Sequence, residues 1–187
     1  MRISVQLDEN GMLPDAYGKF AARPDQRGRM CVRSFPFEVR DIPEGTAALA
    51  WVFMDWDSVP VCGFPWIHWC AQLDGVAGAQ SLTVADDASR GGSTAACPSL
   101  PGAVLEQGYN SAAKSEPAIG VGYVGPCPPN CDHVYTLHVV ALDKACDLGE
   151  GGNGVSNGGK HFWVNELVAA CRGHVLAEAV AQLPSRA

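Results

Sequence analysis

The sequence predicts a mostly β protein in which short strands are joined by many turns. Its 21 glycines and 13 prolines are too many for a helical chain, because both residues interrupt helices and mark turns. Several short segments also carry the β-branched, aromatic and apolar residues that are typical of strands. A length of 187 residues suits a single domain with a substantial core, so we expect one domain over 1–187.

Five segments have the composition expected of strands. In chain order they are 2–7, 34–39, 47–54, 65–73 and 133–142. Pro36 would restrict the second segment to a sheet edge, because proline cannot donate to a β-ladder. The continuous apolar character of the third segment predicts a strand that is covered on both faces.

Loops and one helix are expected in the rest of the chain. Residues 74–108 lack a clear period and predict a long loop with a short helical turn at 86–90, and the glycine-rich residues 149–159 predict a surface loop. The last segment fits a helix capped by Asn165, which Gly173 would weaken by about 1 kcal/mol relative to alanine. Its apolar stripe would consist of Leu167, Val168, Cys171, Val175, Ala179, Val180 and Leu183.

Charge and composition argue against several classes of protein. A net charge of -7 and a pI near 5.1 argue against a nucleic-acid partner, which normally meets a basic surface. No apolar run approaches the about 20 residues that cross a bilayer, and the N-terminus meets charge too early for a signal peptide. We therefore expect a cytoplasmic protein whose eight cysteines are reduced thiols.

A rigid turn that leads into a strand organises the expected site. Residues 125–132 contain three prolines, which fix the backbone and exclude both helix and sheet interior. The strand that follows begins with His133 and Tyr135, which share one face because successive strand residues point in opposite directions. The turn therefore delivers an imidazole and a phenol to one place.

Further polar residues lie at the ends of the two earlier strands. Asp55 and Asp57 follow the buried strand at a spacing that allows them to point the same way, although capping of a turn explains them equally well. His68 lies among aromatic residues and is expected on the opposite face from Trp69. A lone histidine there is usually a hydrogen-bonded core residue, but the second histidine at 133 favours a shared site.

Four separated motifs together resemble the phosphatidylethanolamine-binding protein family, in particular its bacterial Raf-kinase-inhibitor-like branch. They occur in the family's order across nearly the whole chain. The motifs are Asp55-x-Asp57 with Pro60, His68-Trp69, Gly125-Pro126-Cys127-Pro128-Pro129 with His133-x-Tyr135, and Gly173-His174-Val175-Leu176-Ala177.

The resemblance implies a sandwich of a large antiparallel central sheet and a smaller sheet, with peripheral helices that include a C-terminal one. It also implies a pocket for a small anion at one end of the central sheet. The ligand-binding residues would be Asp55, His68, Gly125, Cys127, His133 and Tyr135, supported by Asp57 and Trp69. Relatives linked to kinase regulation imply a protein partner as well, and a homodimer is compatible with the resemblance.

Some positions depart from the family pattern, mostly around the expected pocket. Trp56 replaces the proline between the two aspartates, and Val59 is an extra residue before Pro60. Asn130 and Cys131 stand where glycine is common. A stretch at 34–39 also differs from the family's Ser-Pro-Pro-Leu-x-Trp. These changes affect the opening of the pocket more than its chemistry.

The residues of the expected pocket suit a phosphate-like or carboxylate group. A nearby carboxylate favours an imidazolium, which donates charge-assisted hydrogen bonds from both nitrogens. Tyr135 adds a hydroxyl donor, and backbone amides near Gly125 and Cys127 add a nest for an oxyanion. No cofactor is expected beyond a bound phosphate, sulfate or carboxylate.

Three other interpretations stay open. A hydrolase has the necessary Ser, His and Asp, but no Gly-x-Ser-x-Gly motif occurs and Ser111 is the only serine near a candidate motif, so we do not expect an enzyme. A metal site could use Cys127, Cys131, His133 and His68, although the intervening prolines stiffen the turn and we expect no metal. A protein partner could bind the surfaces at 74–108 and 149–164.

Overall fold

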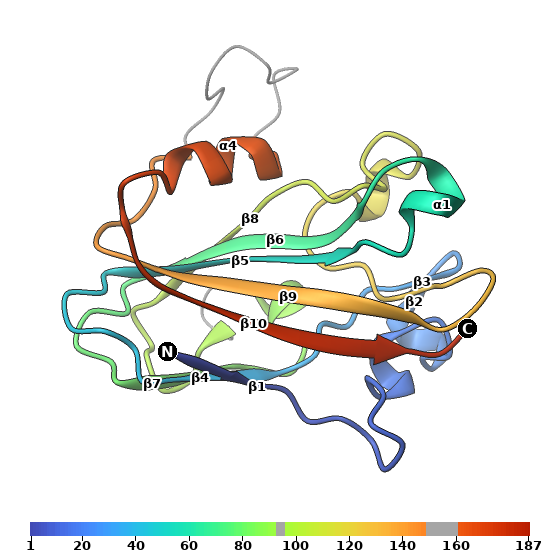
Figure 1. The fold of residues 1–187 in the computed structure, drawn as a ribbon, viewed down its shortest axis with the longest axis horizontal. Helices are drawn as coiled ribbons and strands as arrows, with labels where there is room; N and C mark the ends of the chain where they lie inside the picture. Colours follow the sequence, from blue (N-terminus) through green and yellow to red (C-terminus); the bar gives the residue numbers. More distant parts are fainter. Residues whose placement is uncertain (93–95, 149–160) are drawn as a thin grey trace.

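The computed structural model describes residues 1–92, 96–148 and 161–187 (Figure 1). Its largest sheet has five antiparallel strands in the order β10-β9-β5-β6-β8. These strands are β5 (Ala48–Asp55), β6 (Trp66–Asp74), β8 (Val104–Gln107), β9 (His133–Leu142) and β10 (Val175–Ser185). The strands predicted at 47–54, 65–73 and 133–142 are thereby confirmed.

A smaller antiparallel sheet faces the large one, and the two enclose the main core (Figure 1). It has the order β1-β4-β7, with β1 (Arg2–Ser4), β4 (Phe37–Arg40) and β7 (Ser81–Val84). A two-stranded ladder, β2 (Gln26–Arg27) with β3 (Met30–Cys31), lies at the same end of the molecule as the short helix α1 (Val59–Cys62). The predicted mostly β sandwich is confirmed.

The strand β5 is buried on both faces, as its apolar sequence predicts. Leu49, Trp51 and Phe53 belong to the core between the two sheets. The alternate residues Ala48, Ala50 and Val52 belong to a second apolar cluster, which helix α4 (Val164–Ala170) helps to cover. The middle strand of the large sheet can therefore carry a polar residue only at its end, which is where Asp55 stands.

The C-terminal helix prediction is wrong beyond residue 170. Helix α4 begins after Trp163 rather than Asn165, and the Glu166 carboxylate accepts a hydrogen bond from the Trp163 N–H at 2.7 Å. Gly173 then adopts a left-handed φ of +79°, and β10 follows. The alternate, less exposed residues of β10 include Ala177, Ala179, Ala181 and Leu183. Alanine-rich apolar sequence fits both the helical and the strand period, and pairing with β9 decides for the strand.

Three further predictions also require correction. The predicted edge strand at 34–39 is instead the middle strand β4, which pairs with both β1 and β7, and Pro36 lies before its first residue. The predicted loop at 74–108 contains β7 and β8, because a short alternation of buried and exposed residues is a weak signal. The helical turn predicted at 86–90 corresponds to α2 (Ala88–Gly91), whereas β1 is shorter than predicted.

Short helical turns also occur among the residues that the structure describes. They are the 3-10 helices η1 (Asp15–Tyr17), η2 (Arg23–Asp25) and η3 (Pro117–Ile119). Within the parts of the chain that the structure describes, no helix has the length and apolar character needed to span a membrane. The expected surface loop at 149–159, and most of the surface proposed at 149–164, lie outside the described residues.

Candidate functional site

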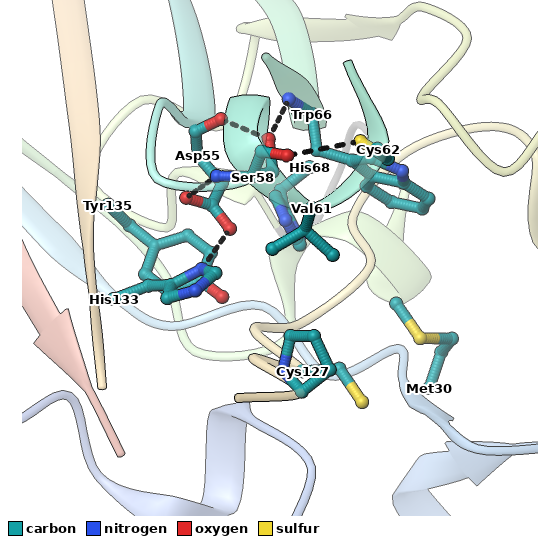
Figure 2. Close-up of a pocket in the computed structure, with 11 residues that line it drawn as sticks. Met30, Asp55, Ser58, Val61, Cys62, Trp66, His68, Cys127, His133 and Tyr135 are labelled. Atoms are coloured by element: carbon teal, nitrogen blue, oxygen red, sulfur yellow. Dashed lines mark hydrogen bonds and ion pairs between the residues drawn. The ribbon is translucent and has the colours of Figure 1, made fainter. Parts of the chain in front are cut away.

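A pocket of about 240 Å³ opens at the end of the large sheet where β5 ends and β6 and β9 begin (Figure 2). Five of the predicted residues line it: Asp55, His68, Cys127, His133 and Tyr135. The exposed fractions of Asp55, His68, His133 and Tyr135 are only 1–4%. Four buried polar side chains from three strands therefore meet at one opening.

His133 is held by the carboxylate of Asp55. Asp55 pairs in register with Tyr135 on β9, which brings the end of β5 beside the start of β9. The Asp55 Oδ2 atom accepts a hydrogen bond from His133 Nδ1 at 2.8 Å, and its Oδ1 atom accepts one from the Ser58 backbone N–H at 3.1 Å. The carboxylate thus fixes both the imidazole ring and Ser58, the residue directly before helix α1.

The second nitrogen of His133 contacts Asn130. His133 Nε2 lies 3.0 Å from Asn130 Oδ1. An Asn amide can present its oxygen to an imidazolium or its NH₂ group to a neutral imidazole, so this contact is compatible with either charge state. Asn130 therefore contacts the ring nitrogen of His133 that Asp55 does not bind.

A β-bulge brings His68 to the pocket. Phe53 pairs with Trp69, but the next residue of β5, Met54, pairs with Ile67, so His68 has no partner on β5. The extra residue turns His68 toward the same face as Trp69, where its ring lies 5.7 Å from that of Phe53 and 5.0 Å from that of Tyr135. The predicted opposite orientation of the two residues is wrong, because strict alternation fails at a bulge.

The surroundings of His68 keep its imidazole neutral. His68 Nδ1 lies 2.8 Å from the Val124 carbonyl oxygen, which can only accept, so Nδ1 carries the proton. Nε2 is then an acceptor in the neutral ring. Burial lowers the pKa of His68 to about 4, with the Asp55 carboxylate acting in the opposite direction. At neutral pH the pocket therefore contains a neutral imidazole that can gain a proton.

Tyr135 lies between the two histidines. Its ring is 5.0 Å from that of His68 and 6.3 Å from that of His133. Burial raises the pKa of Tyr135 far above its usual value, and the charge of Asp55 raises it further. The phenol therefore keeps its proton and remains a hydrogen-bond donor.

The turn at 125–129 supports the pocket differently from the prediction. The Gly125 N–H donates to the Cys31 carbonyl oxygen at 2.8 Å, so this amide is not available to an anion, and Gly125 does not line the cavity. Cys127 and Pro129 do line it, and Figure 2 shows Cys127 across the cavity from Asp55. Lys19 Nζ donates to the Pro128 carbonyl oxygen at 2.9 Å, which fixes the turn from outside.

The two supporting residues lie outside the cavity. Asp57 Oδ2 accepts a hydrogen bond from the Val134 N–H at 2.8 Å and so ties the turn after β5 to β9. Trp69 is fully buried in the core, where its indole N–H donates to Gln107 Oε1 at 2.9 Å. Both residues stabilise the frame of the pocket without facing its interior.

The sequence prediction did not include Ser58 and the helix α1. The Ser58 hydroxyl lies 2.7 Å from the Asp55 carbonyl oxygen and 2.9 Å from the Phe64 carbonyl oxygen, and it accepts from the Trp66 N–H at 2.9 Å. Val59, the extra residue before Pro60, is the first residue of α1. The position of Ser58 directly after Asp57 is the only feature of the sequence that could have indicated its role at the pocket.

The geometry of the site can be compared with the hydrolase and metal-site interpretations. Ser58 bonds to backbone groups, and Ser111 Oγ accepts from the Ile67 N–H, so neither has a hydrogen bond to a histidine within the described residues. Within residues 1–92, 96–148 and 161–187, no three His, Cys, Asp or Glu side chains are arranged to hold a metal ion. The arrangement offers donors and a titratable imidazole to a small polar ligand.

Comparisons with known proteins agree with this architecture. The family model described as phosphatidylethanolamine-binding protein matches residues 3–184. The protein YxkA of Bacillus subtilis, which is described as uncharacterized, is 33% identical over 190 residues, covering 98% of this chain and 99% of that protein.

Solved structures with low sequence identity share the fold. The crystal structure of CT736 from Chlamydia trachomatis, described as a homologue of phosphatidylethanolamine-binding protein, has a TM-score of 0.67 at 22% identity and covers 100% of this chain and 97% of its own. The crystal structure of Escherichia coli YbcL, described as a member of the mammalian PEBP family, has a TM-score of 0.65 at 19% identity, covering 100% and 98%. The chain therefore belongs to the phosphatidylethanolamine-binding protein family.

Proposed function

We propose that this protein is a binding protein whose pocket takes a small anionic group, a phosphate or a carboxylate. The observation that carries the proposal is the convergence of Asp55, His68, His133 and Tyr135 on one open cavity. Buried polar groups are costly unless they are partnered. A cavity that keeps several of them at its wall suits a polar ligand better than an apolar one.

The charges explain how an anion would be held. His133 is hydrogen-bonded to the Asp55 carboxylate, so this pair adds no net positive charge to the pocket. The neutral His68 presents a lone pair at Nε2, which repels an oxyanion. Binding is therefore coupled to protonation of His68, whose imidazolium then donates to the anion together with the Tyr135 hydroxyl.

Inorganic phosphate is expected to shift the imidazole NMR resonances of both His68 and His133, because both rings line the cavity. His174, a surface residue whose Nδ1 lies 2.9 Å from Asp143, serves as the internal control and should stay unchanged. No shift at either pocket residue would contradict the proposal. Titration with phosphoethanolamine and phosphoserine then distinguishes a lipid headgroup from a phosphorylated protein as the source of the phosphate.

Sulfate is expected to bind more tightly as the pH falls. The pKa of the free His68 is near 4, and a bound anion raises it, so the complex takes up a proton that the free protein lacks. When binding takes up one proton, the affinity rises by up to about tenfold for each unit that the pH falls. We expect the affinity to rise at least about tenfold between a pH of about 8 and a pH of about 5. Sulfate itself does not titrate in this range. The measurement is calorimetric titration at several pH values.

The variant His68→Gln should lose this pH dependence, whereas His174→Gln should retain it, because His174 is bonded to Asp143 away from the pocket. If His68→Gln shows the same slope as the unmodified protein, another group takes up the proton and the coupling proposed for His68 is incorrect.

A further inference from the structure

A group of positive charges lies beside the pocket although the protein is acidic overall. The net charge is -7, and five arginines are neutralised by Asp or Glu in ion pairs: Arg2, Arg33, Arg40, Arg90 and Arg186. The segment around β2 contains Lys19, Arg23, Arg27 and Arg29. Among the residues that the structure describes, no carboxylate lies within ion-pair distance of these four.

Three of these cations line a second cavity of about 660 Å³, which we name the basic groove. Lys19, Arg23 and Arg29 line it together with Pro128 and Pro129. Arg27 does not line it, because its guanidinium bonds to the Pro24 and Gln26 carbonyl oxygens. The side chain of Glu116 approaches the turn between β2 and β3 near Gly28, and it does not line the groove.

The basic groove adjoins the pocket. Cys127 and Pro129 line both cavities, so the two are separated only by the turn at 127–129. Lys19 is held in place, since its Nζ donates to the Pro128 carbonyl oxygen at 2.9 Å and lies 5.2 Å from the centre of the Phe20 ring. Arg23 and Arg29 are exposed, and neither guanidinium group is paired with a carboxylate among the residues that the structure describes.

We propose that the basic groove binds a second anionic group of the same ligand, so that the preferred ligand is a small molecule with two or more phosphate groups. The proposal rests on the proposed function of the pocket, which would take the terminal phosphate. Guanidinium groups bind phosphate through two parallel hydrogen bonds, and three unneutralised cations concentrate anions locally against the overall negative charge. The groove is larger than the pocket, as an extended chain of phosphates requires.

The test compares the affinities of inorganic phosphate and inorganic triphosphate by calorimetric titration. We expect triphosphate to bind about tenfold or more tightly than phosphate, and the advantage to shrink as salt is added. In the double variant Arg23→Gln, Arg29→Gln the triphosphate advantage should fall about tenfold, while phosphate affinity changes less than about twofold. The matched control is Lys144→Gln, Arg172→Gln, which removes the same charge from exposed residues that line neither cavity.

Each other outcome is decisive. If phosphate binds and triphosphate binds no more tightly, or if the control pair loses as much affinity as the groove pair, the basic groove is not a subsite and the pocket proposal stands. The same conclusion follows if the groove variant weakens both ligands equally, since long-range charge then explains the effect. If neither anion binds the unmodified protein, the proposed function of the pocket itself fails.

Discussion

Replacing Gly125 by alanine is expected to destabilise the protein by about 3 kcal/mol, at the upper end of the range for overpacking. The added Cβ would overlap the Tyr17 carbonyl oxygen and lie 2.9 Å from the Cβ of Cys31. The first of these neighbours is backbone, and Cys31 is fully buried, so neither can rotate away. The free energy of unfolding from chemical denaturation measures the effect.

Gly102→Ala provides the matched control for this prediction. Its Cβ would meet nothing within 4 Å, and no positive φ is recorded for it. We expect its free energy of unfolding to change by less than about 0.5 kcal/mol. If the two substitutions change the free energy of unfolding equally, the close packing of Gly125 against Tyr17 does not contribute to stability.

Asp55→Ala is expected to cost about 2 kcal/mol of stability and to weaken phosphate binding by about tenfold or more. The substitution leaves two buried donors, His133 Nδ1 and the Ser58 backbone N–H, without their acceptor. Without the carboxylate the imidazole is no longer held at the cavity wall. Denaturation curves measure the first effect, and calorimetric titration with phosphate measures the second.

The same substitution two residues later is the control. Asp57 is exposed and accepts one hydrogen bond, from the Val134 N–H, so Asp57→Ala should cost at most about 1 kcal/mol and leave binding intact. The role assigned to Asp55 is wrong if both variants lose stability and affinity to the same degree, or if Asp55→Ala still binds phosphate as tightly as the unmodified protein.

The apolar strands and the order of the motifs were predictable from the sequence. Residues 47–54 are apolar at every position, which a strand with two covered faces requires. The secondary-structure assignment failed where both periods fit one sequence: Ala179 and Leu183 are four residues apart, as on one face of a helix, and they also fall on one face of a strand. Only pairing with β9, which is a tertiary contact, settles their structure.

The candidate site was predictable in its residue types and not in its contacts. The chain position of His133 and Tyr135 at a strand start indicated their shared location. The contact of Asn130 with His133, and the use of the Gly125 amide by Cys31, depend on how the turn docks on distant segments. Local sequence contains no signal for such contacts.

The bulge in β6 has a consequence for how strand lengths can vary among relatives. Met54 pairs with Ile67 and Phe53 with Trp69. The strand β6 therefore has one extra residue, His68, between two pairs that are adjacent on β5. In a strand shortened by one residue at this point, every paired position would keep its partner, but no unpaired residue would remain to place an imidazole at the pocket. Relatives that bind the same kind of ligand should therefore conserve the length mismatch of these two strands even where the side chains around it differ.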